Sequence, residues 1–460
     1  MQLGLNGNTG IPSAVAVYRI RHASELIAAM VTSVLFVLSS DLFAQAPVSN
    51  ELQLSDLKLR AEFGDPSSMC ILGLNYLHGG EIPKDRKLGI RWIGEAAKHG
   101  DPEAQVTLGT IYFRGDGVPA SNKKAVELFK AAASRGSWQA HSRLAQCYSD
   151  GLGVEQDAIE AARLVKKAEE LKQLEERVTE AMKSRRQGGG VESDKIAFSV
   201  FTEAANAGVP DATWFLACMY AEGVGTPKSD KKAIEWLQKG AELGNSACQL
   251  MLGWWIEEGR GVKADQHEAM HWIREAANQG DDTAQLALAI RLSESRYGHL
   301  NYKEAASWFH KSASLGNAQA RFAYANCCFE GTGVPVNKKK GAEWYRKAAE
   351  QGYADAQYAL GIVYMTGDGV ESDSRIAREW LSKAANQGFY KAQAALGKSY
   401  MRGDGTTRDF VMAYMWLNLA AEGDDGDARL LLDELESKMS ALDISSAQRM
   451  SREWAEQHRK

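Results

Sequence analysis

The stretch YADAQYALGIVYMTGDGVESDSRIAREWLSKAANQG, residues 353–388, contains the pattern that decides the fold. In its first half, Ala356, Leu360 and Tyr364 are spaced four residues apart, so they lie on one face of a helix. Such an apolar stripe on a short helix needs a partner to cover it. This half therefore predicts the first helix of a packed pair.

The middle of the same stretch predicts a tight turn and a second helix. Gly367 and Gly369 interrupt the apolar pattern, and glycine readily adopts the positive φ that a sharp helix exit requires. Asp373 is well placed to cap the second helix through its carboxylate. That helix ends at Gly388, where the next copy of the pattern begins.

A ladder of large apolar residues repeats every 36 residues along the chain. A fixed period in the thirties is typical of stacked helix pairs, because each pair buries its apolar face only against its neighbours. We therefore expect an all-α solenoid of about ten 36-residue helix-turn-helix repeats, with the ladder buried. Its members are Trp92, Leu128, Leu164, Val200, Trp236, Trp272, Trp308, Trp344, Trp380 and Trp416.

The length of 460 residues would ordinarily suggest about three domains, but a solenoid grows by adding repeats. One continuous superhelix is the simpler prediction. We expect a signal peptide at 1–44, a lead-in at 45–64, repeats at 65–423 and a helical cap at 424–460. In the cap, one helix would carry Leu430, Leu431, Leu435, Met439 and Leu442, and another Met450 and Trp454.

One copy of the repeat, near 169–208, departs from the pattern. Its first helix is replaced by the charged segment 169–186, which precedes three glycines. Leu171, Leu174, Val178 and Ala181 still form one apolar seam, so this helix can pack. The copy is interpreted as a drifted repeat, with a bend or weak joint as the alternative. In the copy 281–316 the Gly-x-Gly turn is replaced by SESRYGHLNY at 293–302.

The N-terminal segment has the order of an export signal. Basic residues precede the apolar run 26–38, and small and polar residues follow up to Pro47. A run of 13 residues is short against the roughly 20 that a membrane-spanning helix needs. We therefore expect an exported protein, periplasmic or secreted, without a permanent membrane anchor after cleavage. Cleavage after Ala44 is favoured over cleavage after Ala46, which would leave proline first.

Charge and cysteine content narrow the class of protein further. The formal net charge is −5 and no basic cluster stands out, so nucleic acid is not an expected partner. The six cysteines fall at positions where other copies carry small or apolar residues, among them Cys147, Cys248 and Cys327. We interpret them as buried thiols rather than as a disulfide framework.

The repeat resembles a known family. The pattern Ala-x-Ala-Gln-x-x-Leu-Gly-x-x-Tyr, then Gly-x-Gly-Val, then Ala-x-x-Trp-x-x-Lys-Ala-Ala-x-x-Gly is similar to the Sel-one-like repeat family, which is related to tetratricopeptide repeats. It stands in nearly full form at 104–136, 356–388 and 392–423. The resemblance implies a right-handed α/α superhelix and, for bacterial members, exported adaptors that hold partner proteins. It implies no enzymatic activity and no cofactor.

One motif would support catalysis instead. His267, Glu268 and His271 form a literal H-E-x-x-H, which in zinc proteases places two imidazoles on one helix face with glutamate as the general base. In the other copies, however, the slots of His267 and His271 hold residues such as Lys339 and Glu343, which suit a solvated face. We therefore expect no catalytic, cofactor or metal site, and keep an exported metal-dependent hydrolase as the alternative function.

Other proteins are the expected partners, bound by a stripe on the first helices. Counted from each repeat start, the sixth, tenth and thirteenth positions share one helical face and hold large apolar side chains. This stripe suits a peptide or helix from another protein, although the same positions could pack against the adjacent repeat. The candidate binding residues are Trp214, Trp254, Phe322, Phe329, Tyr358, Met365 and Met401. The sequence thus predicts a non-enzymatic interaction scaffold.

Overall fold

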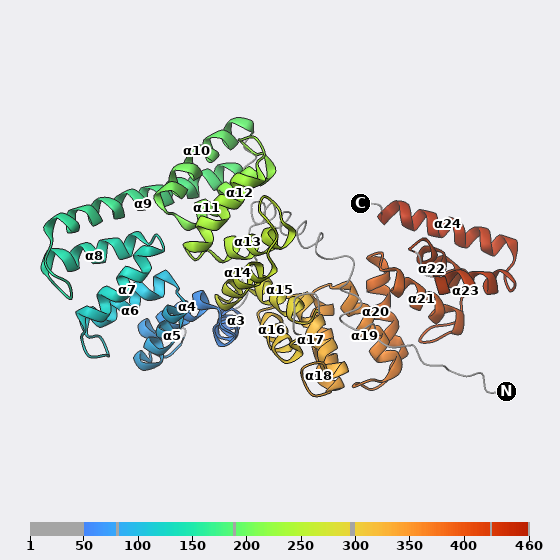
Figure 1. Cartoon of the computed structure of the whole chain (residues 1–460). Coiled ribbons are helices and arrows are strands. Elements are labelled where there is room, and N and C mark those ends of the chain that lie inside the picture. The colour runs from blue at the N-terminus through green and yellow to red at the C-terminus, as the bar shows by residue number, and fades with distance from the viewer. Residues whose placement is uncertain (1–49, 80–81, 187–189, 295–299, 424–425, 459–460) are drawn as a thin grey trace. The chain divides into compact units, whose positions relative to one another are not determined.

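The computed structural model describes residues 50–79, 82–186, 190–294, 300–423 and 426–458. These residues form α-helices joined by short turns, without β-strands (Figure 1). The all-α solenoid of helix pairs is therefore confirmed. By its internal contacts the chain divides into two units, with the boundary between Arg291 and Leu292.

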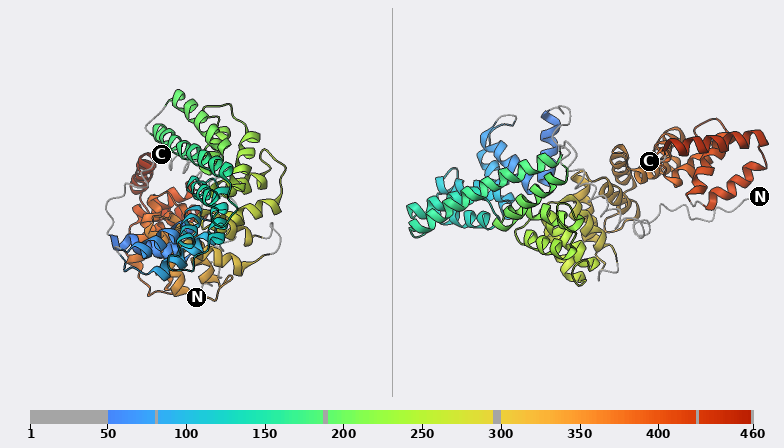
Figure 2. Two further views of the ribbon diagram at one scale, coloured as in Figure 1. Left: turned by 90° about the vertical axis from the view of Figure 1, so that its left-hand side faces the viewer. Right: turned by 90° about the horizontal axis from the view of Figure 1, so that it is seen from above.

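The N-terminal unit stacks its helices side by side in chain order (Figures 1 and 2). The lead-in expected at 45–64 contains the helix α3, which packs on α4. The unit consists of α3 (Asn50–Glu62), α4 (Pro66–His78), α5 (Arg86–Lys98), α6 (Pro102–Arg114), α7 (Asn122–Ser134), α8 (Trp138–Asp150), α9 (Ala158–Arg186), α10 (Val191–Ala207), α11 (Pro210–Glu222), α12 (Asp230–Glu242), α13 (Ser246–Glu258), α14 (Gln266–Asn278) and α15 (Asp282–Leu292).

The C-terminal unit continues the same helix pairs and adds two terminal helices. Most of its repeat helices have the 13-residue length that dominates in the N-terminal unit. It consists of α16 (Tyr302–Ser314), α17 (Ala318–Glu330), α18 (Lys338–Glu350), α19 (Ala354–Thr366), α20 (Ser374–Asn386), α21 (Tyr390–Arg402), α22 (Phe410–Glu422), α23 (Gly426–Glu436) and α24 (Ala441–His458).

The turn within each helix pair follows the sequence prediction. Gly367 and Gly369 have φ of 77° and 80°, and Asp373 accepts the backbone N–H of Arg375 and Ile376, which caps α20. Gly369 is required for a second reason, since a Cβ there would lie 2.5 Å from the carbonyl carbon of Lys338 in the preceding pair. Each turn thus touches its neighbour, and glycine permits that approach.

Only part of the tryptophan ladder is fully buried: Trp308, Trp344 and Trp416 are at most 9% exposed. Trp236, Trp272 and Trp380 are only half-buried, and Lys383 Nζ covers the Trp380 ring at 3.9 Å from its centroid, as lysines three residues on do for Trp236, Trp308 and Trp344. This explains the Trp-x-x-Lys pattern. The centre is filled by the next residue along, namely Leu237, Ile273, Phe309, Tyr345, Leu381 and Leu417.

In several repeats a buried glutamine joins the helix pair to the preceding one. Gln357 Nε2 donates to Ala349 O, eight residues earlier, at 3.1 Å, and Gln249 does the same to Ala241 O. The carbonyls at a helix C-terminus lack intrahelical donors, so this bond satisfies one of them. The Ala-Gln of the repeat pattern is therefore a structural requirement, and Gln105, Gln285 and Gln393 repeat the bond.

The charged copy near 169–208 is held by one unusually long helix. α9 has 29 residues and runs without a turn from the second helix of one repeat into the first helix of the next. Its predicted seam is buried, with Leu171, Leu174, Val178 and Ala181 at most 9% exposed. α9 thus agrees with the interpretation as a drifted repeat, and the helix continues because the turn glycines that would end it are missing there.

The C-terminal cap has two helices, but their boundary differs from the prediction. α23 ends at Glu436, so Leu442 belongs to α24 and is exposed, as is Leu430. Leu435 is buried, and Trp454 of α24 packs edge-on against Trp416 with ring centroids 5.9 Å apart. The cap thus covers the last repeat with fewer of its leucines than the sequence indicated.

The boundary between the units falls where the sequence loses its Gly-x-Gly turn. α15 ends at Leu292 after 11 residues, and the turn that follows lies partly outside the described residues. The signal segment 1–44 also lies outside them. No helix in the described part of the chain is long and apolar enough to span a membrane. All six cysteines are free and Cys218 is the least buried, which agrees with buried thiols.

Candidate interaction site

The seven residues of the predicted stripe fall into two groups. Trp254, Phe322 and Phe329 are buried among neighbouring helices, whereas Tyr358 and Met365 are half-buried, as are Trp214 and Met401. Phe322 lies between the rings of Tyr345 and Tyr353, and Tyr358 lies against Phe389 of the next repeat. Phe322 therefore contributes to packing between repeats, whereas Phe329 stacks on Tyr345 within its own repeat. Binding by the half-buried members stays a prediction.

The H-E-x-x-H motif lies on the outer face of α14. His267, Glu268 and His271 are all exposed, and Asp265 accepts the backbone N–H groups of His267 and Glu268 as the helix cap. Among the described residues, no three His, Cys, Asp or Glu side chains are grouped so as to hold a metal ion. The motif follows from two outer positions of a repeat helix that happen to carry histidine.

A cavity of about 1030 Å³ lies within the N-terminal unit, where turns between successive repeats converge. Most of the wall comes from turns where the second helix of one repeat ends and the first helix of the next begins, and the rest comes from α9. The lining residues lie within the segments 65–67, 99–107, 135–139, 175–182, 209–215, 243–246 and 279–281. Turns far apart in sequence touch, since a Cβ on Gly280 would lie 2.8 Å from Asp65 Cα. His99 Nδ1 also lies 3.2 Å from Asn278 O.

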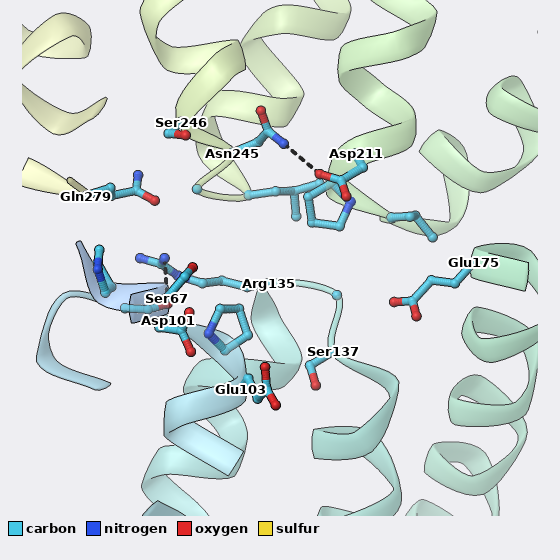
Figure 3. Close-up of a pocket in the computed structure, with 18 of the residues that line it drawn as sticks. Ser67, Asp101, Glu103, Arg135, Ser137, Glu175, Asp211, Asn245, Ser246 and Gln279 are labelled. Atoms are coloured by element: carbon cyan, nitrogen blue, oxygen red, sulfur yellow. Dashed lines mark hydrogen bonds between the residues drawn. The ribbon is translucent and has the colours of Figure 1, made fainter. Parts of the chain in front are cut away.

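The wall of this cavity is rich in carboxylates. Figure 3 shows Asp101, Glu175 and Asp211, which come from three different segments and face the same space. Asp101 accepts the N–H of Ala104 at 2.6 Å as the cap of α6, and Asp211 accepts from Asn245 Nδ2 at 3.0 Å. These bonds hold the carboxylates in place without neutralising them.

Burial raises the carboxyl pKa values of several wall residues. Burial raises the pKa of Asp281 to about 6, and the neighbouring carboxylates of Asp282 and Asp65 add to the rise. Burial likewise raises the pKa of Asp101, Glu175 and Asp211 above their ordinary values. In each case the loss of hydration on burial outweighs the hydrogen bonds that stabilise the charged carboxylate.

Arg135 brings the one permanent positive charge among the residues of the wall. Its Nη1 donates to Gly100 O at 2.8 Å, and its guanidinium lies beside Gly244 of a distant repeat. The equivalent residues in the C-terminal unit are glutamines, and Gln351 and Gln387 donate to Gly316 O and Gly352 O. Arg135 thus replaces a glutamine of the repeat pattern with a longer, charged donor.

Sequence reasoning missed the cavity, although one signal was present. The first position of the repeats holds Asp65, Asp101, Asn245 and Asp281 in the N-terminal half but Tyr353 and Phe389 later. An aspartate at a helix start is ordinarily explained as a cap. Its second role depends on how tightly the turns approach, which the repeat pattern alone does not reveal.

Comparison with protein families finds the Sel1 repeat. Nine copies match, at residues 66–101, 102–137, 138–172, 210–245, 246–281, 283–317, 318–353, 354–389 and 391–425. The segment 173–209, which contains the end of α9 and all of α10, lies outside the matched copies. No curated protein matches the chain.

Solved structures give the same result. The chain is 31% identical to c5321, described as a protective antigen present in uropathogenic Escherichia coli strains and displaying an SLR fold; the match covers 86% of this chain and 85% of that one, with a TM-score of 0.57. A Sel1 repeat protein from Oxalobacter formigenes is 25% identical over 53% of this chain and 96% of its own, with a TM-score of 0.47.

Proposed function

Because this chain belongs to the Sel1 repeat family, we propose that it is a non-enzymatic scaffold that binds a partner protein in the periplasm or the secreted fraction. Sel1 repeat proteins are generally protein-interaction scaffolds. The observation that carries the proposal for this chain is the cavity shared by turns from successive repeats. A wall built from so many repeats offers a broad surface, as repeat proteins do for protein partners.

Export is supported by the sequence of the first 46 residues, where basic, apolar and small residues follow in the order of a signal peptide. Intact mass of the protein recovered from the producing cell should show that 44 or 46 residues have been removed. A cytoplasmic protein that retains Met1 would contradict the export part of the proposal.

Partner binding is tested by photo-crosslinking in the exported compartment. A photoreactive amino acid at Ser67, on the cavity wall, should trap a defined partner, whereas the same group at the exposed Glu379 should not. Mass spectrometry then identifies the trapped protein. Equal trapping at both positions, or none at any surface position, would contradict a scaffold with a defined binding surface.

The half-buried stripe residues are a second surface for the same function. Tyr358→Ser combined with Met365→Ser should abolish partner capture while leaving stability nearly intact, if these side chains bind the partner. A fall in the free energy of unfolding of more than about 2 kcal/mol would assign both side chains to the core instead. Urea unfolding together with the crosslinking yield separates the two outcomes.

A further inference from the structure

The cavity of the N-terminal unit has a strongly unequal charge balance. Six wall residues carry carboxylates, namely Asp65, Asp101, Glu103, Glu175, Asp211 and Asp281, whereas Arg135 carries the permanent positive charge. Asp65 lies near enough to both Asp101 and Asp281 to affect their ionisation. Carboxylates held close together by a folded wall repel one another, and a cation placed among them relieves that repulsion.

The chain itself provides a precedent for the kind of group that fits. The Arg135 guanidinium enters this space and donates to Gly100 O, and it lies between turns of two distant repeats. A guanidinium presents several N–H donors in a planar fork, which suits carboxylates and carbonyl oxygens. One guanidinium leaves most of the carboxylates of the wall without a cationic partner among the wall residues.

An unpaired acceptor lies behind the same wall. Gln105, between the wall residues Glu103 and Val106, is 7% exposed, and its Oε1 has no donor. In two other repeats the equivalent oxygen is satisfied, since Gln249 and Gln357 accept from the glutamine 30 residues later. Arg135 occupies that place for Gln105 but donates to Gly100 O instead. Gln285 Oε1 is likewise buried without a donor, so the unpaired oxygen belongs to the helix packing behind the wall and not to the wall itself.

The size and chemistry of the space favour a peptide over a small molecule. Its volume of about 1030 Å³ is at the upper end of the roughly 300–1,000 Å³ of small-molecule pockets, which are lined mainly by apolar side chains. Here charged and polar residues from successive turns make up much of the wall. The negative charge also disfavours phosphate-bearing ligands.

We propose that this cavity binds an extended segment of a partner protein that carries several arginine or lysine side chains. The proposal rests on the scaffold function and specifies its partner. The basic side chains would lie among Asp101, Glu175 and Asp211, and their donors would bond to the carboxylates as Arg135 bonds to Gly100 O. Charge-assisted bonds of this kind are among the stronger ones that proteins form.

The test uses the purified chain and a fluorescein-labelled octa-arginine peptide, with octa-glutamate as the peptide control. Fluorescence anisotropy at physiological salt should show saturable binding of octa-arginine alone. The variant Asp101→Asn, Glu175→Gln, Asp211→Asn removes three negative charges from the wall and keeps the shape of each side chain. It should weaken the affinity about tenfold or more.

A matched control removes the same number of charges elsewhere. Glu127, Glu235 and Glu275 are exposed on α7, α12 and α14, so changing all three to glutamine alters the net charge equally. This variant should change the affinity by less than about twofold, as a remote surface charge acts weakly at physiological salt. Equal weakening by both triple variants would show general attraction to an acidic protein and would overturn the proposal.

A third variant blocks the cavity without changing its charge, and its melting curve separates blocked binding from loss of folding. Ser67 is exposed on the wall, and Ser67→Trp should weaken octa-arginine binding about fivefold or more while the circular-dichroism melting curve is retained. Unaltered binding by a folded Ser67→Trp variant would overturn the proposal, as would tight binding of spermine with none of octa-arginine. A partner trapped in the cell without octa-arginine binding would leave the scaffold function intact and reject only this inference.

Discussion

The two units share one backbone pattern but differ at the turn where one repeat meets the next. In the last two repeats of the C-terminal unit the first position holds Tyr353 or Phe389, and each ring lies against the sixth position of the preceding repeat, Phe322 or Tyr358. The ring centroids are 5.6 and 5.5 Å apart. Apolar rings therefore seal this turn.

In the N-terminal unit the first position holds no aromatic residue, although the sixth position varies from Val106 to Trp214. Asp101, Asn245 and Asp281 hold the first position, and Val106 at the sixth position lines the cavity. The comparison teaches that the residue at the first position decides whether a turn is sealed by an aromatic pair or remains polar. The helices and their caps are the same in either case.

Breaking an aromatic seal should have the largest effect on stability. Phe322 is 6% exposed between two tyrosine rings, so Phe322→Ala should lower the free energy of unfolding by about 3–5 kcal/mol. Val106→Ala, at the equivalent position of the N-terminal unit, should cost about 1 kcal/mol or less because Val106 is half-buried beside the cavity.

Urea unfolding followed by circular dichroism measures both effects, with hydrogen exchange of α17 and α6 to assign each loss to its unit. The two units need not unfold in a single transition, so the midpoints are compared unit by unit. Similar costs for the two variants would refute the distinction between a sealed and an open turn.

A smaller, pH-dependent effect is expected when Asp281 of the N-terminal unit is replaced by asparagine, the residue that Asn317 provides at the first repeat position in the C-terminal unit. Asn317 caps α17 at the first repeat position, so Asp281→Asn should preserve the cap of α15. Burial raises the pKa of Asp281 to about 6, against roughly 3.9 in an unfolded chain. The folded state therefore holds the proton more tightly, and the stability due to Asp281 is lost as the pH rises from about 4 to about 6.

Asp281→Asn should accordingly be more stable than the natural chain by roughly 1–3 kcal/mol at pH 7.5, and the difference should vanish below about pH 4. Thermal unfolding over this pH range provides the measurement. A variant that is less stable at pH 7.5 would show that the carboxylate is compensated in the fold. If the variant gained stability but bound octa-arginine more weakly, Asp281 would be a residue that lowers the stability of the fold and contributes to binding.

The smallest effect is expected on the outer face, where the two units do not differ. His267 and His271 on α14 occupy the slots that Lys339 and Glu343 occupy on α18, and all four are exposed. Replacing either pair by alanine should change the free energy of unfolding by less than about 0.5 kcal/mol. Retention of one equivalent of zinc after dialysis by the natural chain, but not by the histidine variant, would revive the hydrolase alternative.

The predicted repeats, caps and turns were reliable because they depend on local chemistry. Asp373 caps its helix and Gly367 takes a positive φ for reasons that lie within a few residues. The tryptophan ladder fixed the register correctly, yet some of its rings, such as Trp380, are only half-buried and have a lysine across them. Periodicity shows which residues recur together but not which neighbour, Trp344 or Tyr345, reaches the centre.

The sequence by itself determined the helix pairs, their 36-residue period, the thiols and the outer face, since each follows from spacing and composition along the chain. Only the tertiary structure decided how tightly the turns approach one another. Gly280 meets Asp65, Arg135 reaches Gly244 and six carboxylates share one cavity because small rotations between adjacent repeats accumulate over many copies. The sequence pattern of a single repeat does not reveal this accumulated rotation, so the cavity could not be predicted from the repeat pattern.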